Sequence, residues 1–578
     1  MAFNNATITF PTVGDMTSYT VPLLGIDTRA TVLGYNNVGD DGGGEFYYDS
    51  GSSATVDGGV VFSTSMSTGG RWIRLFNTSL NPRFFGAKGD GTTDDSTDFN
   101  NCLASTYASH VDISDGTYIV QNLTISSART VTLSAGATLK LKASAGANPI
   151  LTVSATAQYT KISGGVFDGN KANQTSTNNG IEISADDVTI QNCQVTSTSW
   201  IGIHGTGNRP FILNNYVQNT DYIGIYFEPT TTSGKKIEGG IIEGNTVDRS
   251  MLTNTSIVEG ALKVHGNSTN SVAKWRIINN LVKLPISPTA VACVCIEVQN
   301  NTTNCVISNN ITNGGQIGIS TGSPYTSITG NTIDAASLYG IESGVSFVTI
   351  TGNAVYGVDD STGTAVTQRG ITLDGTATNC TISANTIYNT TQNGIYLTAS
   401  RKYIAITGNS ISLSAASVPY AINMEGTCSF INISGNQLFG NAITAKGILV
   451  TDGSYVTISS NSFDSFTQNG ILMLGSGTNV TDNITVMNNV FHSVNVAFAF
   501  QAGGTSSMGN NIVVFGNTGL KNYLDFKNEV LLITGSGTPQ SAVTASVGAQ
   551  FLRNDGGANT TLYIKESGTN TNTGWVGK

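Results

Sequence analysis

Charged residues are scarce in this sequence. Lys and Arg number 27 and Asp and Glu 37 among 578 residues, a share of 11%, whereas globular proteins average about 25%. With so few basic residues and a formal net charge of −10, we expect no binding to nucleic acid or to an anionic membrane surface. No run of about 18 apolar residues occurs, so no transmembrane helix is predicted. The opening residues MAFNNATITF lack the basic start and apolar run of a signal peptide, and none is expected.

Cysteine is also rare, and its spacing argues against the usual frameworks. The seven cysteines are an odd number, and no Cys-x-x-Cys pair occurs. Cys293 and Cys295 lie one residue apart, with no histidine nearby to complete a zinc set. We therefore expect free thiols that pack as small apolar side chains, and neither a metal nor a cofactor.

Glycine, by contrast, is abundant and forms part of a repeat. A segment of the form Gly-Ile-x-apolar recurs, as in GIEIS at 180, GIYFE at 224 and GILML at 470. Its apolar anchors are 22 to 37 residues apart, with a base period of about 22. The anchors are Ile181, Ile203, Ile225, Leu262, Ile296, Ile319, Ile341, Ile371, Ile395, Ile422, Ile448 and Ile471.

A repeat of this length predicts stacked coils. Short strands cannot bury their inward residues within one coil, but they can do so by stacking on the same strand of the next coil. Alternation with period 2, in segments rich in Thr, Val, Ile and Gly, excludes helical repeats. A propeller blade would need about 40 residues or more. The sequence therefore predicts an all-β solenoid, a parallel β-helix with three short strands in each coil.

Asparagine marks a turn before each repeated strand. Asn tolerates the left-handed backbone conformation and forms local hydrogen bonds. Stacked at one corner of successive coils, such side chains can form a ladder of amide hydrogen bonds. The expected positions are Asn192, Asn214, Asn245, Asn279, Asn309, Asn331, Asn353, Asn385, Asn409, Asn436 and Asn461.

The segment that precedes the repeats resembles a known family. Residues 81–99, NPRFFGAKGDGTTDDSTDF, closely resemble the segment that leads into the right-handed β-helix of the pectate-lyase-like superfamily. In that superfamily an FGAkGDGxtDDT-type turn is followed by a capping helix. The glycines permit tight turns, and Asp94 or Asp95 can cap the helix. A structural role therefore explains Asp90, Asp94 and Asp95 better than a catalytic one.

Both ends of the chain extend this resemblance. Residues 35–75 look like the small β-rich module that precedes the helix in phage tailspikes, and residues 542–578 are similar to a terminal module of tail fibres and tailspikes. The family that these segments together resemble is that of the phage tailspike depolymerases. The resemblance implies a homotrimer on the virion tail that binds, and usually cleaves, bacterial surface polysaccharide.

The resemblance divides the chain into four parts. Residues 1–80 are expected to form an N-terminal β-rich module, and 81–110 the turn and capping helix. Residues 111–525 are expected to form the right-handed parallel β-helix, and 526–578 a C-terminal module associated with the trimer. No long particle-anchoring domain precedes residue 30, so attachment is expected to run through a phage tail or adaptor protein.

The repeat also maps an outward face, because the residue after each anchor points away from the core. Coils stack about 4.8 Å apart, so equivalent residues of successive coils are neighbours. One group over five coils is conspicuous in so weakly charged a chain, and it includes two of the four histidines. Gathering titratable groups costs repulsion and desolvation unless they serve a function, although a solvated face is the simpler alternative. The group is Glu182, His204, Tyr226, Glu228, Lys263, His265, Glu297 and Gln299.

Three carboxylates in this group suggest glycoside hydrolysis. Glu228 lies two coils, or about 9.6 Å, from both Glu182 and Glu297, and this spacing suits inverting better than retaining enzymes. We therefore predict Glu228, Glu297 and Glu182 as catalytic residues. Glu228 is expected to be a general acid whose pKa is raised by an apolar wall.

The other members of the group are predicted to bind substrate, namely His204, Tyr226, Lys263, His265 and Gln299. The same cations with Tyr226 would also suit a lyase that acts on a uronate, which needs a base and neutralisation of the carboxylate. Aromatic platforms for sugars are a weaker interpretation of Tyr222, Tyr226, Tyr396, Trp200 and Trp275, because aromatic residues beside a coil more often stack on their neighbours.

Insertions between the repeats could form walls beside this face, at 230–236, 249–258, 283–291 and 354–368, although drift or trimer contacts explain them equally well. The leading hypothesis is a depolymerase. The alternatives are a receptor-binding tail protein that does not cleave, and a secreted pectate-lyase-like enzyme. The missing signal peptide and the tail-like C-terminal segment make the last one weaker.

Overall fold

The structure is a computed structural model of the whole chain. It falls into two compact units: the first comprises Met1–Thr255 and Ala261–Leu281, the second Ser256–Gly260 and Val282–Lys578. Each is described by itself. The residues that the structure describes are 7–21, 28–230, 236–250, 259–284, 293–357, 369–414, 418–475, 481–502, 511–519, 532–543, 545, 547–558, 560–568 and 571–578.

The first unit opens with a small sheet of order β1-β2-β3-β5-β4. Its first strand pairs parallel to the second, whereas the remaining pairs are antiparallel. Phe46 and Trp72 are fully buried between this sheet and the short helix α1 (Val13–Ser18), which begins with a capping box formed by Thr12 and Asp15. The strands are β1 (Thr7–Phe10), β2 (Arg29–Val32), β3 (Gly44–Asp49), β4 (Val61–Phe62) and β5 (Arg71–Leu75).

The glycine-rich segment that follows leads into the first coil. It contains β6 (Ser79–Leu80), the 3-10 turn η1 (Pro82–Phe85), β7 (Asp90–Asp94), helix α2 (Ser96–Ala104) and β8 (His110–Ile113).

Three aspartates of this segment hold its turns. The carboxylate of Asp95 accepts from the backbone N–H groups of Lys88 and Gly89, and Asp90 accepts from Thr92 and Thr93. Asp94 accepts from Ser96. The structural role expected for these aspartates is confirmed. Asp95, at the N-terminal end of α2, makes no side-chain capping bond to that helix.

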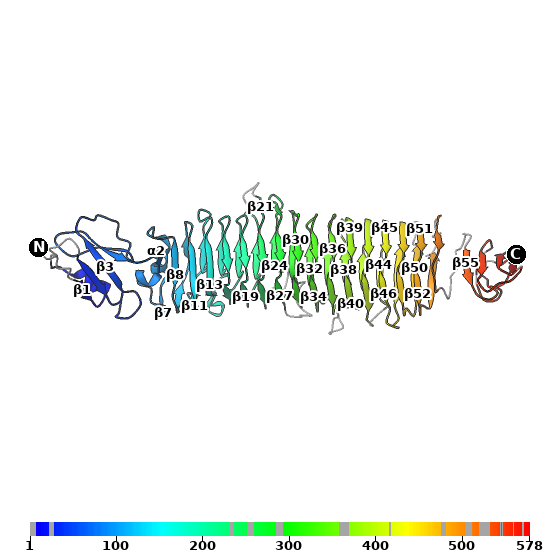
Figure 1. The fold of residues 1–578 in the computed structure, drawn as a ribbon, viewed down its shortest axis with the longest axis horizontal. Helices are drawn as coiled ribbons and strands as arrows, with labels where there is room; N and C mark the ends of the chain where they lie inside the picture. The colour runs from blue at the N-terminus through cyan, green and yellow to red at the C-terminus, as the bar shows by residue number, and fades with distance from the viewer. Residues whose placement is uncertain are drawn as a thin grey trace. The chain divides into compact units, whose positions relative to one another are not determined.

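Each unit then contains parallel strands that stack coil on coil, as the rungs of Figure 1 show. The strands that carry the predicted face in the first unit are β10 (Leu123–Ile125), β12 (Leu151–Val153), β14 (Ile181–Ile183), β17 (Ile203–Gly205), β20 (Ile225–Phe227) and β24 (Glu259–His265). Those in the second unit are β28 (Cys293–Gln299), β32 (Ile317–Thr321), β35 (Tyr339–Ser343), β38 (Arg369–Leu373), β41 (Asn393–Leu397), β44 (Tyr420–Met424), β47 (Lys446–Thr451), β50 (Asn469–Gly475) and β53 (Val496–Ala502).

Further strands complete each coil, from β15 (Thr189–Gln191) and β16 (Gln194–Thr196) in the first unit to β51 (Asp482–Met487) and β52 (Val490–His492) in the second. A last sheet holds β55 (Leu532–Gly535), β56 (Gln550–Arg553), β57 (Leu562–Lys565) and β58 (Trp575–Gly577). The predicted parallel β-helix is therefore confirmed. None of the described helices is long and apolar enough to cross a bilayer.

Columns of aliphatic side chains form the core. All twelve predicted anchors are completely buried, and the register places Ile181 beside Ile203 and Ile203 beside Ile225. Burial of one such side chain stabilises a fold by about 1.5–3 kcal/mol. The column therefore fixes the register and with it the outward face. All seven cysteines are buried thiols in this fold, as expected.

The asparagine ladder is present, but four of its expected members lie outside it. Asn192, Asn214, Asn279 and Asn309 instead occupy left-handed turns with φ of 54–57°. The next residue points inward, and it is Cys193 after Asn192 and a ladder asparagine after the other three. The amides that stack are Asn215, Asn245 and Asn280 in the first unit, and Asn310, Asn331, Asn353, Asn385, Asn409, Asn436, Asn461, Asn489 and Asn517 in the second. In a pair of adjacent asparagines, the first makes the turn and the second the ladder.

Removal of one ladder residue should destabilise the second unit strongly. Asn385 Oδ1 accepts from the backbone and side-chain N–H groups of Asn353, and its Nδ2 donates to Asn409 Oδ1. Asn385→Leu leaves these buried groups unpaired, at about 1–3 kcal/mol each. We expect a marked fall in the thermal midpoint, measured by calorimetry. Asn432→Leu, on the exposed side of β45 (Ser429–Ser434), is the control, and an equal effect of both substitutions would contradict the prediction.

Candidate functional sites

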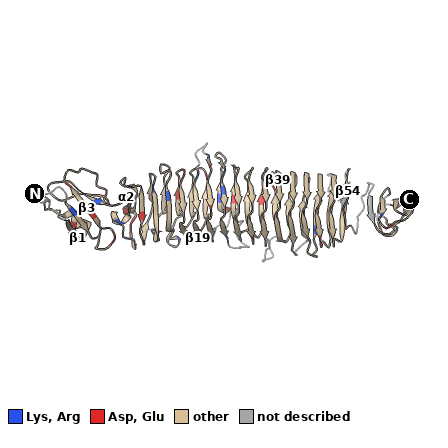
Figure 2. Ribbon diagram, in the orientation of Figure 1, with Lys and Arg blue, Asp and Glu red and all other residues tan. Residues whose placement is uncertain are grey.

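The first unit brings the middle of the predicted group together in one column. The register of the parallel strands pairs Glu182 with His204, His204 with Tyr226, and Tyr226 with Lys263. Each of these residues lies between two buried neighbours of its strand, so its side chain points away from the core. Glu228 follows β20 directly and lies beside the same column. Charged side chains are few on the strands, as Figure 2 shows, which makes this column distinctive.

His204 lies between two carboxylates. Its Nδ1 is 2.8 Å from Glu182 Oε2, and its Nε2 is 3.5 Å from Glu228 Oε1. Asn179 donates from Nδ2 to the other oxygen of Glu182 and so orients that carboxylate. The side chains of Glu182 and Glu228 are 26% and 35% exposed, and that of His204 is 16% exposed. Both carboxylates can therefore meet a ligand, with the imidazole held between them.

Tyr226 and two further cations complete this array. The Tyr226 hydroxyl donates to Glu228 Oε2 at 2.7 Å. Its ring centroid is 5.4 Å from that of His204 and 6.4 Å from that of His265, and Lys263 Nζ is 5.7 Å from it. The array of Glu182, His204, Tyr226 and Glu228 is called the histidine bridge below.

The charges of the histidine bridge shift the pKa of Glu228 in the direction opposite to the predicted one. Burial disfavours a charged imidazole, but the flanking Glu182 and Glu228 outweigh it and raise the pKa of His204 to about 9. The interaction with His204 lowers the pKa of Glu228, against burial, and the Tyr226 hydroxyl lowers it further. The prediction of a raised pKa for Glu228 was therefore wrong, because its polar partners act more strongly than any apolar wall. Glu228 is a carboxylate suited to the role of a base.

The geometry allows two-carboxylate chemistry with a proton held between the partners. One imidazole ring and its two contacts separate Glu182 from Glu228. His204 Nδ1 is hydrogen-bonded to Glu182, so the charged imidazole can supply a proton to that carboxylate.

Two predicted residues of the face are less accessible than expected. Glu297 is only 3% exposed and Lys263 only 4%. Both sides of β28 are covered as far as Val298, so Glu297 does not occupy the solvated outward position that the repeat predicted. Gln299, at the end of β28, donates to Ser320 Oγ at 3.0 Å.

A second group of carboxyls, which the sequence did not single out as a site, lies on the outward face of the second unit. Ser320 Oγ donates to Glu342 Oε2 at 3.0 Å. Burial and then the negative charge of Asp374 raise the pKa of Glu342, and burial also raises the pKa of Asp374. The two carboxyls therefore compete for ionisation and favour one shared proton. The outward positions could be derived from the repeat, but the burial that perturbs them could not.

The carboxyl pair of Glu342 and Asp374 should lower the stability of the fold at neutral pH. A carboxyl whose pKa is raised in the folded chain stabilises it at acidic pH, and that contribution is lost as the pH rises through the raised pKa. Glu342→Gln keeps an acceptor for Ser320 and removes the charge. We expect a higher thermal midpoint at pH 8 and no gain at pH 4, because the raised pKa of Glu342 disfavours its charged form in the folded chain. A lower midpoint at pH 8 would contradict this.

The suggested aromatic platforms have mostly structural roles. Trp200 and Tyr222 stack on each other, with ring centroids 4.1 Å apart. Trp275 is fully buried against Phe227, so it cannot face a sugar. The guanidinium of Arg369 lies 3.6 Å over the ring of Tyr396. The greater part of the four predicted insertions lies outside the described residues.

Sequence comparison identifies the N-terminal sheet. Residues 9–77 match the family described as phage tail protein small four-stranded beta-sheet domain. The chain carries a domain similar to this phage tail domain at residues 9–77. The match covers the antiparallel strands β2, β3, β5 and β4, and it supports a location on the virion tail.

A second family match covers part of the β-helix. Residues 340–506 match the family described as periplasmic copper-binding protein (NosD). In this segment Cys380 and Cys428 are buried, and His492 lies 2.7 Å from Asp464. Across the described residues, no group of three or more His, Cys, Asp or Glu could hold a metal ion, so these residues do not fit a copper site. No curated protein matches the chain in sequence.

Several solved structures are similar to this chain. One is the tailspike protein gp49 from Acinetobacter baumannii bacteriophage Fri1, a capsular polysaccharide depolymerase, with 14% identity, a TM-score of 0.36, and coverage of 89% of this chain and 76% of that one. Another is the A-module of the Azotobacter vinelandii mannuronan C-5 epimerase AlgE4, with 15% identity, a TM-score of 0.36, and coverage of 75% and 100%. A third is the N-terminal fragment of bacteriophage Phi29 gene product 12, with 17% identity, a TM-score of 0.42, and coverage of 79% and 75%. Likeness at this level transfers no activity.

Proposed function

We propose that this protein binds a bacterial surface polysaccharide and depolymerises it by hydrolysis of glycosidic bonds. The observation that carries the proposal is the histidine bridge, in which two accessible carboxylates flank one protonated imidazole on the outward face of a β-helix. The phage tail domain supports a polysaccharide of the host surface as the substrate. The homotrimer implied by the resemblance stays a prediction.

The proposed roles follow from the charges. Glu228 takes a proton from a water molecule, whose oxygen attacks the anomeric carbon as the bond to the leaving oxygen breaks. Glu182 takes the Nδ1 proton of the charged His204, 2.8 Å away, and delivers it to that leaving oxygen. Glu228, whose side chain is 35% exposed, then releases the proton gained from water to the solvent. The imidazole regains its Nδ1 proton from solvent, so one proton enters and one leaves the site in each turnover.

A second candidate is elimination from a uronate-containing glycan. The observation that favours it is the cationic surrounding of Tyr226, whose ring lies near the charged His204, near His265 and 5.7 Å from Lys263 Nζ. Such cations could neutralise a uronate carboxylate while a base removes the adjacent proton. In the hydrolytic proposal, Tyr226 instead donates a hydrogen bond to Glu228.

Product analysis tests the proposal. The purified full-length protein is applied to a typed panel of capsular and other surface polysaccharides, and clearing, new reducing ends and ultraviolet absorbance are recorded. New reducing ends without absorbance support hydrolysis. Absorbance from an unsaturated uronate would replace hydrolysis with elimination. Binding without any cleavage would overturn the enzymatic proposal and leave a receptor-binding protein.

A further inference from the structure

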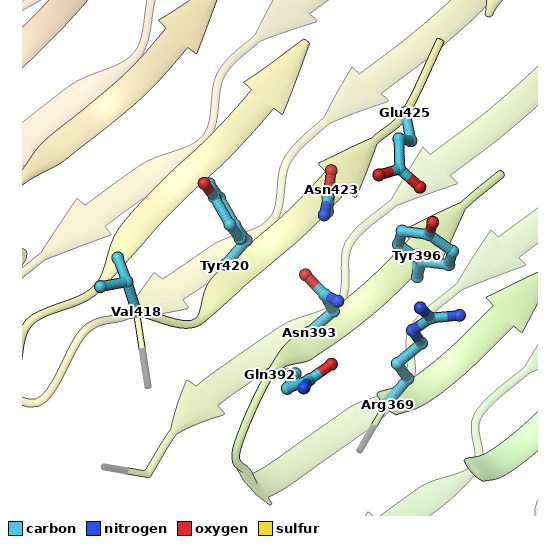
Figure 3. Close-up of a pocket in the computed structure, with 8 residues that line it drawn as sticks. All are labelled: Arg369, Gln392, Asn393, Tyr396, Val418, Tyr420, Asn423 and Glu425. Carbon is cyan, nitrogen blue, oxygen red and sulfur yellow. The ribbon is translucent and has the colours of Figure 1, made fainter. Parts of the chain in front are cut away.

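The outward face of the second unit contains a pocket that the histidine bridge does not explain. It has a volume of about 220 Å³ and lies over β38, β41 and β44. Figure 3 shows its lining, in which polar side chains from these neighbouring strands converge. Drug-sized ligands occupy about 300–1,000 Å³, so this space suits a smaller group, such as one sugar ring.

Two asparagines in this pocket are unusual. Asn393 is 5% exposed and Asn423 is 8% exposed, yet the side-chain oxygen of each has no hydrogen-bond partner. Both residues line the pocket. Buried acceptors are nearly always paired in native proteins, because an unpaired one costs free energy. Two in one pocket therefore indicate a ligand that donates hydrogen bonds.

The ladder asparagines show how buried amides look when they are paired. Asn409, one coil from Asn385, accepts with its Oδ1 from both N–H groups of that residue. Asn393 and Asn423 lie on the opposite, outward side of their strands, where the register places Asn393 beside Tyr420 and Asn423 beside Tyr396. Tyr420 already accepts from Lys446 Nζ at 3.3 Å. The fold itself therefore leaves the two oxygens to an external donor.

The charges of the pocket argue against an anionic ligand. Arg369 is the basic group of the lining, and its guanidinium lies flat over the Tyr396 ring. Glu425 lines the same pocket. Its negative charge, with those of Asp374 and Glu342, favours the charged form of Arg369 against the effect of burial. The basic and the acidic group of the lining therefore offset each other, and the lining has no surplus of positive charge to attract a ligand carboxylate. Hydroxyl groups need no such charge and supply the donors that the two oxygens need.

We propose that this pocket binds one uncharged sugar residue, whose hydroxyls donate to Asn393 Oδ1 and Asn423 Oδ1. The guanidinium of Arg369, whose Nε is buried without a partner, donates to a ring or hydroxyl oxygen of the same sugar. The inference rests on the proposed function in taking a glycan as ligand, and it adds a neutral unit to the composition of that glycan. The pocket holds the glycan, whereas cleavage belongs to the histidine bridge.

Saturation-transfer NMR on the full-length protein tests the pocket directly. The probes are methyl glycosides of neutral hexoses and of N-acetylhexosamines, with glucuronate as the anionic arm. We expect at least one neutral glycoside to bind, and to bind more tightly than glucuronate. Absence of binding across the neutral panel, or tighter binding of glucuronate, would overturn the proposal.

Two variants connect the binding to the pocket. Asn393→Leu and Asn423→Leu keep the side-chain volume and remove the acceptor, so the affinity for the bound glycoside should fall at least tenfold. Both variants should keep or raise the thermal midpoint, because they remove an unpaired buried oxygen, and this separates lost binding from lost folding. Asn432→Leu is the matched control. Unchanged affinity in both variants would overturn the pocket assignment.

A failure of the pocket assignment can be distinguished from a failure of the proposed hydrolytic function. Glu228→Gln should retain the glycoside affinity while cleavage is lost. On a cleaved polysaccharide, Asn393→Leu should raise KM and leave kcat nearly unchanged. If no polysaccharide is cleaved but the glycoside binds, the hydrolytic proposal fails and the pocket stands.

Discussion

Glu228→Gln is expected to lower polysaccharide turnover at least about a hundredfold, since a general acid or base typically contributes 10²–10⁴. Glutamine keeps the shape and can still accept from the Tyr226 hydroxyl, but it cannot take a proton from water. The lowered pKa of Glu228 places the group in its basic form at neutral pH, so the loss should appear in kcat. Reducing-end release under saturating substrate measures it.

The folded state should survive this change. Glu228 is partly exposed and follows the buried Phe227 of β20, so the core column is untouched. The matched control is Glu243→Gln in β22 (Ile241–Glu243), a carboxylate on another sheet of the same unit, which should keep full activity. Turnover of Glu228→Gln at the wild-type rate would move the site away from the histidine bridge.

His204→Asn is expected to cause a loss of similar size and to change the pH profile. Asparagine can form hydrogen bonds but cannot supply a proton to Glu182. Wild-type activity should decline as the pH rises through about 9, the pKa to which the two carboxylates raise His204. The residual activity of the variant should have no such decline. Retention of the alkaline limb in His204→Asn would show that another group controls it.

Stability should respond to the same titration. The folded pKa of His204 lies above its ordinary value of about 6.5, so its contribution is complete below pH 6.5 and is lost as the pH rises through about 9. The lowered pKa of Glu228 acts in the other direction, and its contribution is lost only as the pH falls through that lowered value. Lys263, His265 and Tyr226 are the other titratable groups beside these two residues.

Calorimetry across pH checks this linkage. The thermal midpoint of the wild-type first unit should fall between pH 6.5 and 9, whereas the midpoint of His204→Asn should be lower at pH 6.5 and nearly flat over that range. Parallel curves for the two proteins would indicate that His204 is not held in its charged form by the carboxylates.

The fold was predictable because it repeats. Ile203 and its eleven counterparts recur with one local pattern, and a strand that alternates inward and outward leaves a single way to bury them, by stacking. All twelve anchors are buried. The same alternation placed Glu182, His204 and Tyr226 in one outward column. The pattern could not decide between two adjacent asparagines, as at Asn214 and Asn215, because the choice depends on which residue adopts positive φ.

The chemistry of each site depended on distances that no pattern contains. Whether the pKa of Glu228 rises or falls depends on burial against hydrogen bonds, and only the positions of His204 Nε2 and the Tyr226 hydroxyl settle that balance. Glu297 has the same place in the repeat as Glu182, yet it is buried.

The unpaired oxygens of Asn393 and Asn423 likewise emerge only when three strands are in register. The sequence by itself determined the β-helix, the outward column and the tail-like ends. The tertiary structure decided the direction of the pKa shift of Glu228, the burial of Glu297 and the formation of the pocket. Electrostatic energies and burial depend on neighbours from other coils, which lie far away in the chain.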